Sequence, residues 1–136
     1  MIKIKTLYPL MIEAFQEGKS FSFPVKGTSM QPLLHSNDVV TIIPKKEYNV
    51  GDIVLFNRSD DEFVLHRIIK KRNDFFDIVG DHQTRIEKNV SKDKIIGCVI
   101  SYSKKGEINN LDTKRYQFYK FIVRFRVFRF LFSKLK

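Results

Sequence analysis

The stretch at residues 62–70 reads Glu-Phe-Val-Leu-His-Arg-Ile-Ile-Lys. Its length and its aliphatic and aromatic content are typical of a β-strand. Successive side chains of a strand point to opposite faces, so His66 shares one face with the aliphatic residues two positions away. Arg67 is expected on the other face. His66 is therefore predicted to project from a rigid strand.

Strand-like stretches recur on both sides of residues 62–70. Polar turns at 58–61 and 72–74 are short enough to join antiparallel neighbours. Further strands are predicted at residues 21–25, 39–43, 52–57, 75–79 and 95–101. This succession predicts a mostly β domain, built as a folded-over antiparallel sheet or a partial barrel.

The N-terminal residues predict a short helix at 10–18. Pro9 suits its first turn and Gly18 its C-terminal end. Glu13 and Glu17 follow the apolar run, and no small-residue cleavage site is visible, so no secretory leader is expected. No stretch reaches the roughly 18 to 20 uninterrupted apolar residues of a membrane span.

Length and charge separate a compact, nearly neutral body from a basic tail. The chain has 136 residues with 43% hydrophobic content, enough for one compact core. We expect a domain at 1–112, with its core at 19–103, and a tail at 113–136. Residues 114–136 carry eight Lys and Arg and no acid, so most of the net charge of +10 belongs to the tail. The single cysteine, Cys98, excludes an internal disulfide and is expected to pack in an apolar strand.

Residues 27–32, Gly-Thr-Ser-Met-Gln-Pro, form a predicted turn that offers a nucleophile. A serine hydroxyl such as that of Ser29 reacts only when a neighbouring group removes its proton. Gly27 lets the backbone approach a substrate, Met30 can fix the turn in apolar surroundings, and Pro32 prevents the strand from continuing. The Ser29 N–H could stabilise an oxyanion, and Thr28 could add a hydroxyl.

His66 is the side chain best suited to activate Ser29 near neutral pH. A neutral imidazole usually needs a carboxylate to orient its second nitrogen. The candidates follow the next hairpin, at Asp81 and Glu87. The separation of Ser29 and His66 along the chain does not by itself decide between a catalytic and a structural role.

Six short segments resemble, in order, the conserved boxes of the type I signal peptidase family. They are Gly27-x-Ser29-Met30-x-Pro32, Asn37-Asp38, residues 51–56, residues 65–69, residues 79–81 and residues 96–99. They look most like the Ser/His branch of archaea and the endoplasmic reticulum, and like small bacterial relatives grouped as S24/S26-type serine peptidases. The resemblance covers about residues 23–101 and implies a signal-peptidase-like folded sheet.

The resemblance also implies roles for single residues. Ser29 matches the family's nucleophile, and His66 stands where bacterial signal peptidases carry a lysine base. Asp81 matches the aspartate thought to orient or stabilise that histidine. Glu87 stands where the Ser/His branch has a second aspartate.

Three departures from the family pattern bear on function. Asn37 replaces a glycine in a turn, which Asn tolerates because it accepts left-handed backbone geometry. Gly27 lacks the hydroxyl that many bacterial signal peptidases use for the oxyanion. The N-terminal transmembrane anchor typical of signal peptidases is not seen in this sequence.

The tail is predicted to be a basic, aromatic helix. In helical spacing one stripe contains Phe118, Phe121, Phe125, Phe128, Phe132 and Leu135. Such a helix could lie in a membrane interface, with its cations near anionic headgroups. Alternatively the stripe packs on the domain or on a second copy, or the tail forms a strand. Nucleic acid is not the expected partner, because Phe130-Leu131-Phe132 is too apolar for an exposed groove.

These residues together predict a serine endopeptidase that cleaves leader or precursor peptides near a membrane. No metal or organic cofactor is expected, since His35 and His82 have no Cys partners and no His-Glu-x-x-His arrangement. Two alternatives remain open. One is a self-cleaving regulatory peptidase domain, and the other is a catalytically silent membrane-binding module.

Overall fold

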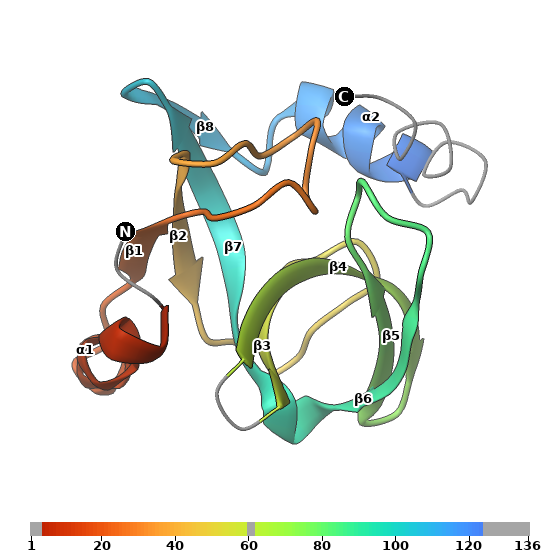
Figure 1. Cartoon of the computed structure of the whole chain (residues 1–136), viewed down its shortest axis with the longest axis horizontal. Coiled ribbons are helices and arrows are strands. Elements are labelled where there is room, and N and C mark those ends of the chain that lie inside the picture. Colours follow the sequence, from red (N-terminus) through yellow and green to blue (C-terminus); the bar gives the residue numbers. More distant parts are fainter. Residues whose placement is uncertain (1–3, 60–61, 124–136) are drawn as a thin grey trace.

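The computed structural model describes residues 4–59 and 62–123 and contains, within these ranges, eight strands and two α-helices (Figure 1). The strands are β1 (Phe21–Pro24), β2 (Val39–Ile43), β3 (Ile53–Ser59), β4 (Glu62–Arg72), β5 (Phe75–Val79), β6 (Glu87–Ser91), β7 (Ile95–Lys104) and β8 (Glu107–Asn110). The helices are α1 (Ile4–Gln16) and α2 (Lys114–Val123), and a 3₁₀ turn spans Lys92–Lys94.

The strands form one open antiparallel sheet in the order β1-β2-β7-β3-β4-β5-β6, and β8 pairs with β7. Strand β7 joins two parts of this sheet, because it pairs with β2 through one half and with β3 through the other. Strands β3 to β6 curve round one another, as Figure 1 shows. The predicted fold class, a mostly β folded antiparallel sheet, is confirmed.

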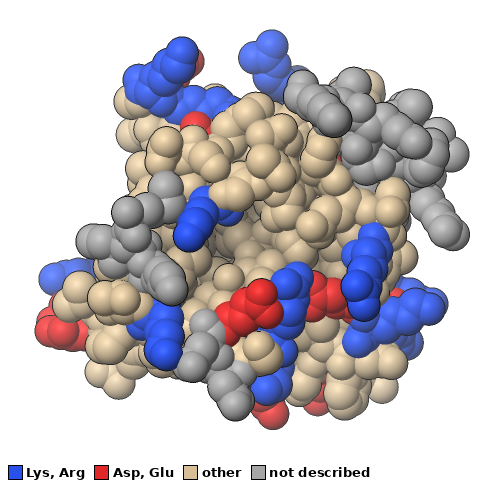
Figure 2. Space-filling view, in the orientation of Figure 1, with Lys and Arg blue, Asp and Glu red and all other residues tan. Residues whose placement is uncertain are grey.

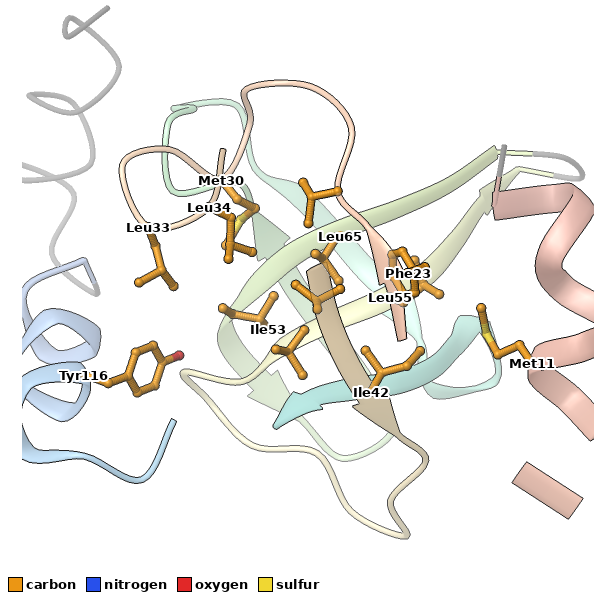
Figure 3. Packing of buried hydrophobic residues seen from close by; sticks show 13 residues of the cluster. Met11, Phe23, Met30, Leu33, Leu34, Ile42, Ile53, Leu55, Leu65 and Tyr116 are labelled. Carbon is orange, nitrogen blue, oxygen red and sulfur yellow. The ribbon is translucent and has the colours of Figure 1, made fainter. Parts of the chain in front are cut away.

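Two groups of buried apolar residues fill the fold. The first contains Phe23, Leu34, Ile53 and Leu55 and extends to both helices, with Met11 at the α1 end and Tyr116 at the α2 end (Figure 3). The second lies within the curved part, around a set made of Tyr48, Val54, Phe56, Ile68, Phe76, Ile78 and Cys98. Because strand residues alternate between faces, β3 and β4 contribute to both groups. Cys98 packs in the second group as expected, and burial raises the pKa of its thiol to about 12.

The N-terminal helix is longer than its sequence predicts. α1 is already formed at Ile4, so Pro9 lies inside it rather than at its start. Ile4, Leu7 and Met11 recur at helical spacing and pack on the first core group. Their burial offsets the hydrogen bond that Pro9 cannot donate. Gly18 ends the helix with a left-handed φ of 74°, as expected.

The C-terminal residues that the structure describes are helical. α2 runs over Lys114–Val123, buries Tyr116 and Val123, and leaves Phe118 and Phe121 exposed by 67% and 54%. Phe125, Phe128, Phe132 and Leu135 of the predicted stripe lie outside the described residues. Tyr116 and Tyr119 of this helix pack on the first core group. In the described ranges, neither helix is long and apolar enough to cross a bilayer.

Candidate active site

Ser29 lies in a tight turn between β1 and β2, held by its own backbone. Gly27 takes a φ of 91°, and its N–H donates to the Ser36 hydroxyl at 3.0 Å. The Gln31 N–H donates to the Thr28 carbonyl at 3.1 Å. Met30 is buried in the first core group, so the turn is fixed in apolar surroundings and Ser29 stays half-exposed.

His66 lies in the middle of β4, opposite Val54 of β3, and is only 2% exposed. The ring of Phe56 lies 6.1 Å from the imidazole centroid and forms part of its apolar surroundings. In the described residues, Nδ1 of His66 has no hydrogen-bond partner. The imidazole is thus held by packing, in the rigid position that a strand provides.

Gly80 brings Ser29 and His66 together. A Cβ placed on Gly80 would lie 2.5 Å from the Ser29 carbonyl oxygen and 3.1 Å from Nε2 of His66. The His82 N–H donates to the same Ser29 carbonyl at 2.9 Å. Only glycine fits between the two groups at this separation. The segment after β5 therefore lies against both the serine turn and the imidazole.

A cavity of about 650 Å³ opens beside this pair, and Ser29, Met30 and His66 contribute to its wall. Other parts of the wall come from α1, from the end of β1 and the residues that follow it, from the first half of β4, and from Arg58 and Gln83. Figure 2 shows a hollow near the centre of the face seen in Figure 1, with basic and acidic side chains at its rim. Its mixture of apolar walls and a few polar groups is typical of a ligand site.

Burial controls the charge of His66. Removal of the imidazole from water lowers its pKa from the ordinary 6.5 to about 4. The negative charges of Glu87 and Asp81 raise this pKa, and the positive charge of Arg58 lowers it further. His66 is consequently neutral at physiological pH, the state in which an imidazole accepts a proton.

Glu87 is the carboxylate that faces Nδ1 of His66. It begins β6, and its Oε1 lies 3.8 Å from Nδ1, slightly beyond hydrogen-bond distance. The same oxygen accepts from Nε of Arg58 at 3.0 Å and from Nη2 of Arg58. Nε2 thus faces Gly80, which also contacts the Ser29 carbonyl, whereas Nδ1 faces a carboxylate that Arg58 already binds.

Asp81 is bound to a different partner from the one expected. Its carboxylate accepts two hydrogen bonds from Arg67, from Nε at 2.7 Å and from Nη2 at 2.8 Å. Asp81 and Arg67 are both 1% exposed. Asp81 therefore acts on His66 through its charge, while its hydrogen bonds go to Arg67 and Tyr119.

The other expected contacts surround the serine turn. Gly27, Met30 and Ser29 line the cavity, and Thr28 and Pro32 are exposed in the same turn. The N–H of Ser29 has no backbone partner in the described part of the chain, so it is available to an oxyanion. His35 lies away from the site on the surface, where it contacts Lys104. No group of three or more potential metal ligands occurs among residues 4–59 and 62–123.

Sequence reasoning missed Arg58, Arg67 and Tyr119. The alternation along residues 62–70 places Arg67 on the other face of the strand from His66, among apolar residues. A buried arginine needs an acidic partner, so this pattern could have indicated one. Arg58 was expected in the turn at 58–61, but it lies near the end of β3, and nothing in the local sequence distinguishes it from other charged residues. Tyr119 belongs to the segment that was predicted as a basic, aromatic helix, with no indication that it would reach Asp81.

The comparisons with known proteins identify a family for most of the chain. A family model described as Peptidase S24-like matches residues 3–100, which include Ser29, His66, Asp81 and Glu87. Neither the curated proteins nor the solved structures include a match to this chain.

Proposed function

This chain belongs to the Peptidase S24-like family, and from that premise we propose that it is a serine endopeptidase in which Ser29 is the nucleophile and His66 the base. The observation that carries the proposal is the contact of Gly80 with both groups. The Ser29 backbone and Nε2 of His66 converge there, beside a cavity that can admit a peptide.

The proposed proton path follows the two nitrogens of His66. The Ser29 hydroxyl attacks the peptide carbonyl as Nε2 takes its proton, and Nε2 then donates that proton to the leaving amine. Glu87 orients the ring by accepting from Nδ1–H, once its carboxylate closes the 3.8 Å gap. The Ser29 N–H stabilises the tetrahedral oxyanion. Water then attacks the acyl-enzyme as Nε2 takes its proton, and Nε2 returns that proton to the Ser29 oxygen as the acid product leaves.

The sheet supports an extended peptide as the substrate. Strand β4 pairs with β5 only from Arg67 onward, so its first half has an edge that no described strand occupies. The cavity lies along this edge and along β1, which is an edge strand of the described sheet. A peptide that adds to such an edge binds through its main chain and presents its scissile bond to a fixed nucleophile.

We further propose that the substrate is a leader or precursor peptide cleaved close to a membrane. The order of the sequence boxes resembles signal peptidases, whose relatives prefer small side chains before the cut. Phe118 and Phe121 of α2 are exposed by 67% and 54%, and the same helix carries Lys114, Arg115 and Lys120. Exposed rings beside basic residues suit the interface of an anionic bilayer.

Hydrolysis of fluorogenic peptides with small residues before the scissile bond tests the proposal. Ser29→Ala and His66→Ala are each expected to lower kcat by roughly a thousandfold or more. Ser20→Ala and His35→Ala remove the same groups from exposed positions and are expected to retain wild-type turnover.

The outcomes separate the alternatives. Equal turnover by Ser29→Ala, His66→Ala and wild type would remove both residues from the mechanism. Absence of peptide cleavage by the wild type, together with a shortened chain that Ser29→Ala does not produce, would identify a self-cleaving domain. Absence of both reactions would leave a silent binding module.

A further inference from the structure

A buried ion pair lies directly behind the proposed catalytic residues. Arg67 follows His66 on β4, and Asp81 lies between Gly80 and His82, whose backbones contact the imidazole and the Ser29 carbonyl. The guanidinium of Arg67 holds the Asp81 carboxylate with two hydrogen bonds of 2.7 and 2.8 Å. The position of the 80–82 segment therefore depends on where the Asp81 side chain is fixed.

Helix α2 completes this ion pair with two tyrosines. The hydroxyl of Tyr119 donates to Oδ2 of Asp81 at 2.8 Å, and Nη1 of Arg67 donates to the hydroxyl of Tyr116 at 2.8 Å. The guanidinium carbon lies 5.6 Å from the ring centroid of Tyr119 and 5.7 Å from that of Tyr116. These distances suit a cation–π contact in a buried site.

The hydroxyl of Tyr119 is committed to its role as a donor. Burial, with the adjacent Asp81 charge, raises the pKa of Tyr119 far above its ordinary value, so the phenol stays protonated. Hydrogen bonds from a neutral donor to a buried carboxylate are stronger than ordinary ones, because one partner is charged. The Tyr119 hydroxyl thus fixes Oδ2 of Asp81 from the α2 side.

The side chain of Lys120 adds a packing contact to the same region. A Cβ on Gly51 would lie 2.7 Å from Cδ of Lys120, so the aliphatic stem of Lys120 covers the Gly51 backbone. The carbonyl of Gly51 in turn accepts from Nη1 of Arg67 at 2.8 Å. Figure 1 shows the loop between β5 and β6 next to α2. The helix therefore contacts this ion pair through side chains and covers the turn before β3.

We propose that Tyr119 and Tyr116 are positioning residues of the peptidase, which hold the segment 80–82 against Ser29 and His66 through Asp81 and Arg67. The expected effect on kcat rests on the proposed function. The expected effect on the position of residues 80–82 does not. Helix α2 then has a part in the reaction: the C-terminal helix sets the geometry of the nucleophile and the base. Membrane contact by Phe118 and Phe121 would be a separate property of its other face.

The test removes the hydroxyl of Tyr119 and keeps its ring. Tyr119→Phe keeps the packing of α2, so the domain is expected to fold, while the hydrogen bond to Asp81 is lost. The matched control is Tyr102→Phe on β7, which removes a hydroxyl from another partly buried ring packed on the first core group. The Tyr116→Phe variant tests the second tyrosine in the same way.

Two readouts are measured on the full-length chain. We expect Tyr119→Phe to lower kcat for the fluorogenic peptide about tenfold with KM changed less than about twofold, since one charge-assisted hydrogen bond is lost. We also expect the His82 amide, which donates to Ser29, to exchange with deuterium about tenfold faster by NMR. Amides of β2 and β7 are expected to keep their wild-type exchange rates in Tyr119→Phe. All amides of the Tyr102→Phe control are expected to exchange at wild-type rates.

The exchange readout keeps this inference distinct from the proposed function. Wild-type protein without peptidase activity would overturn the proposed function, and faster His82 exchange in Tyr119→Phe would still support the positioning role. Unchanged kcat and unchanged His82 exchange in Tyr119→Phe would overturn the positioning role. Faster exchange throughout the sheet would also overturn it, because α2 would then stabilise the fold as a whole.

Discussion

Two Arg–carboxylate pairs flank His66, and they differ in burial. The inner pair, Arg67 with Asp81, is 1% exposed on both sides and has both carboxylate oxygens engaged. The outer pair, Arg58 with Glu87, has side chains exposed by 37% and 25%. A buried pair is costly to disturb and holds one geometry, whereas a half-exposed pair exchanges partners at small cost. The inner pair is therefore suited to hold residues 80–82 in place, and the outer pair to respond to the charge that forms on His66.

Removal of the inner carboxylate is expected to have the largest effect. Asp81→Asn leaves the Arg67 charge buried without its counter-ion, and we expect a loss of about 3–5 kcal/mol in the free energy of unfolding. Urea denaturation measures this loss. The matched change at the outer pair, Glu87→Gln, is expected to cost less than about 1 kcal/mol. Equal losses in the two variants would remove the distinction between the pairs.

Glu87→Gln is expected to act on the reaction instead. An amide cannot stabilise the imidazolium that forms when His66 takes the Ser29 proton, so we expect kcat for peptide hydrolysis to fall roughly a hundredfold. KM should change little, because Glu87 is not among the residues that line the cavity. Full activity of Glu87→Gln would leave the charge of Asp81 as the remaining candidate for this role.

The strands that have a strong local pattern are predicted from the sequence, and the strands that depend on their neighbours are not. The bounds of β2 and β5 agree with the predicted strands, because both are dense in apolar residues with clear turns beside them. Strands β6 and β8 were not predicted. They read Glu-Lys-Asn-Val-Ser and Glu-Ile-Asn-Asn, and only pairing with β5 and β7 makes them strands.

The sequence predicted which residues form the candidate site better than it predicted the contacts between them. The resemblance of the sequence segments to a peptidase family indicated Ser29, His66, Asp81 and Glu87, and the structure gathers all four around Gly80 and β4. The partners of the two carboxylates depend on Arg58 and on α2, which lie far away in the sequence. Such long-range pairing leaves no periodic pattern, so no local rule predicts it.

Arg58 provides a smaller and more specific test of the outer pair. The proposed base is neutral His66, so kcat/KM should be flat above its pKa of about 4 and fall as pH drops through that value. Arg58→Met removes the cation that lowers this pKa and releases Glu87, which raises it. We expect the acid limb of the pH profile to move upward toward 6.5. A limb that stays in place, or moves down, would contradict the assignment.

The smallest expected effect extends the comparison to α2, whose buried and exposed faces are proposed to differ in function. Phe118→Ser with Phe121→Ser removes exposed rings and leaves Tyr116 and Tyr119 in place. We expect binding to anionic vesicles to weaken several-fold in flotation, with peptide turnover in solution unchanged. Truncation near residue 112 is a poorer test, because it would also strip the tyrosines from the inner pair. Undiminished flotation of the double variant would reject membrane contact by this face.

The most direct test of the Ser29–His66 pair is the chemical trapping of the acyl-enzyme. A peptide thioester ending in a small residue is mixed with the protein, quenched rapidly in acid and analysed by mass spectrometry after digestion. The account predicts an acyl group on Ser29 that forms quickly in the wild type, much more slowly in His66→Ala and not at all in Ser29→Ala. Acylation at another residue, or equal rates in the wild type and His66→Ala, would contradict it.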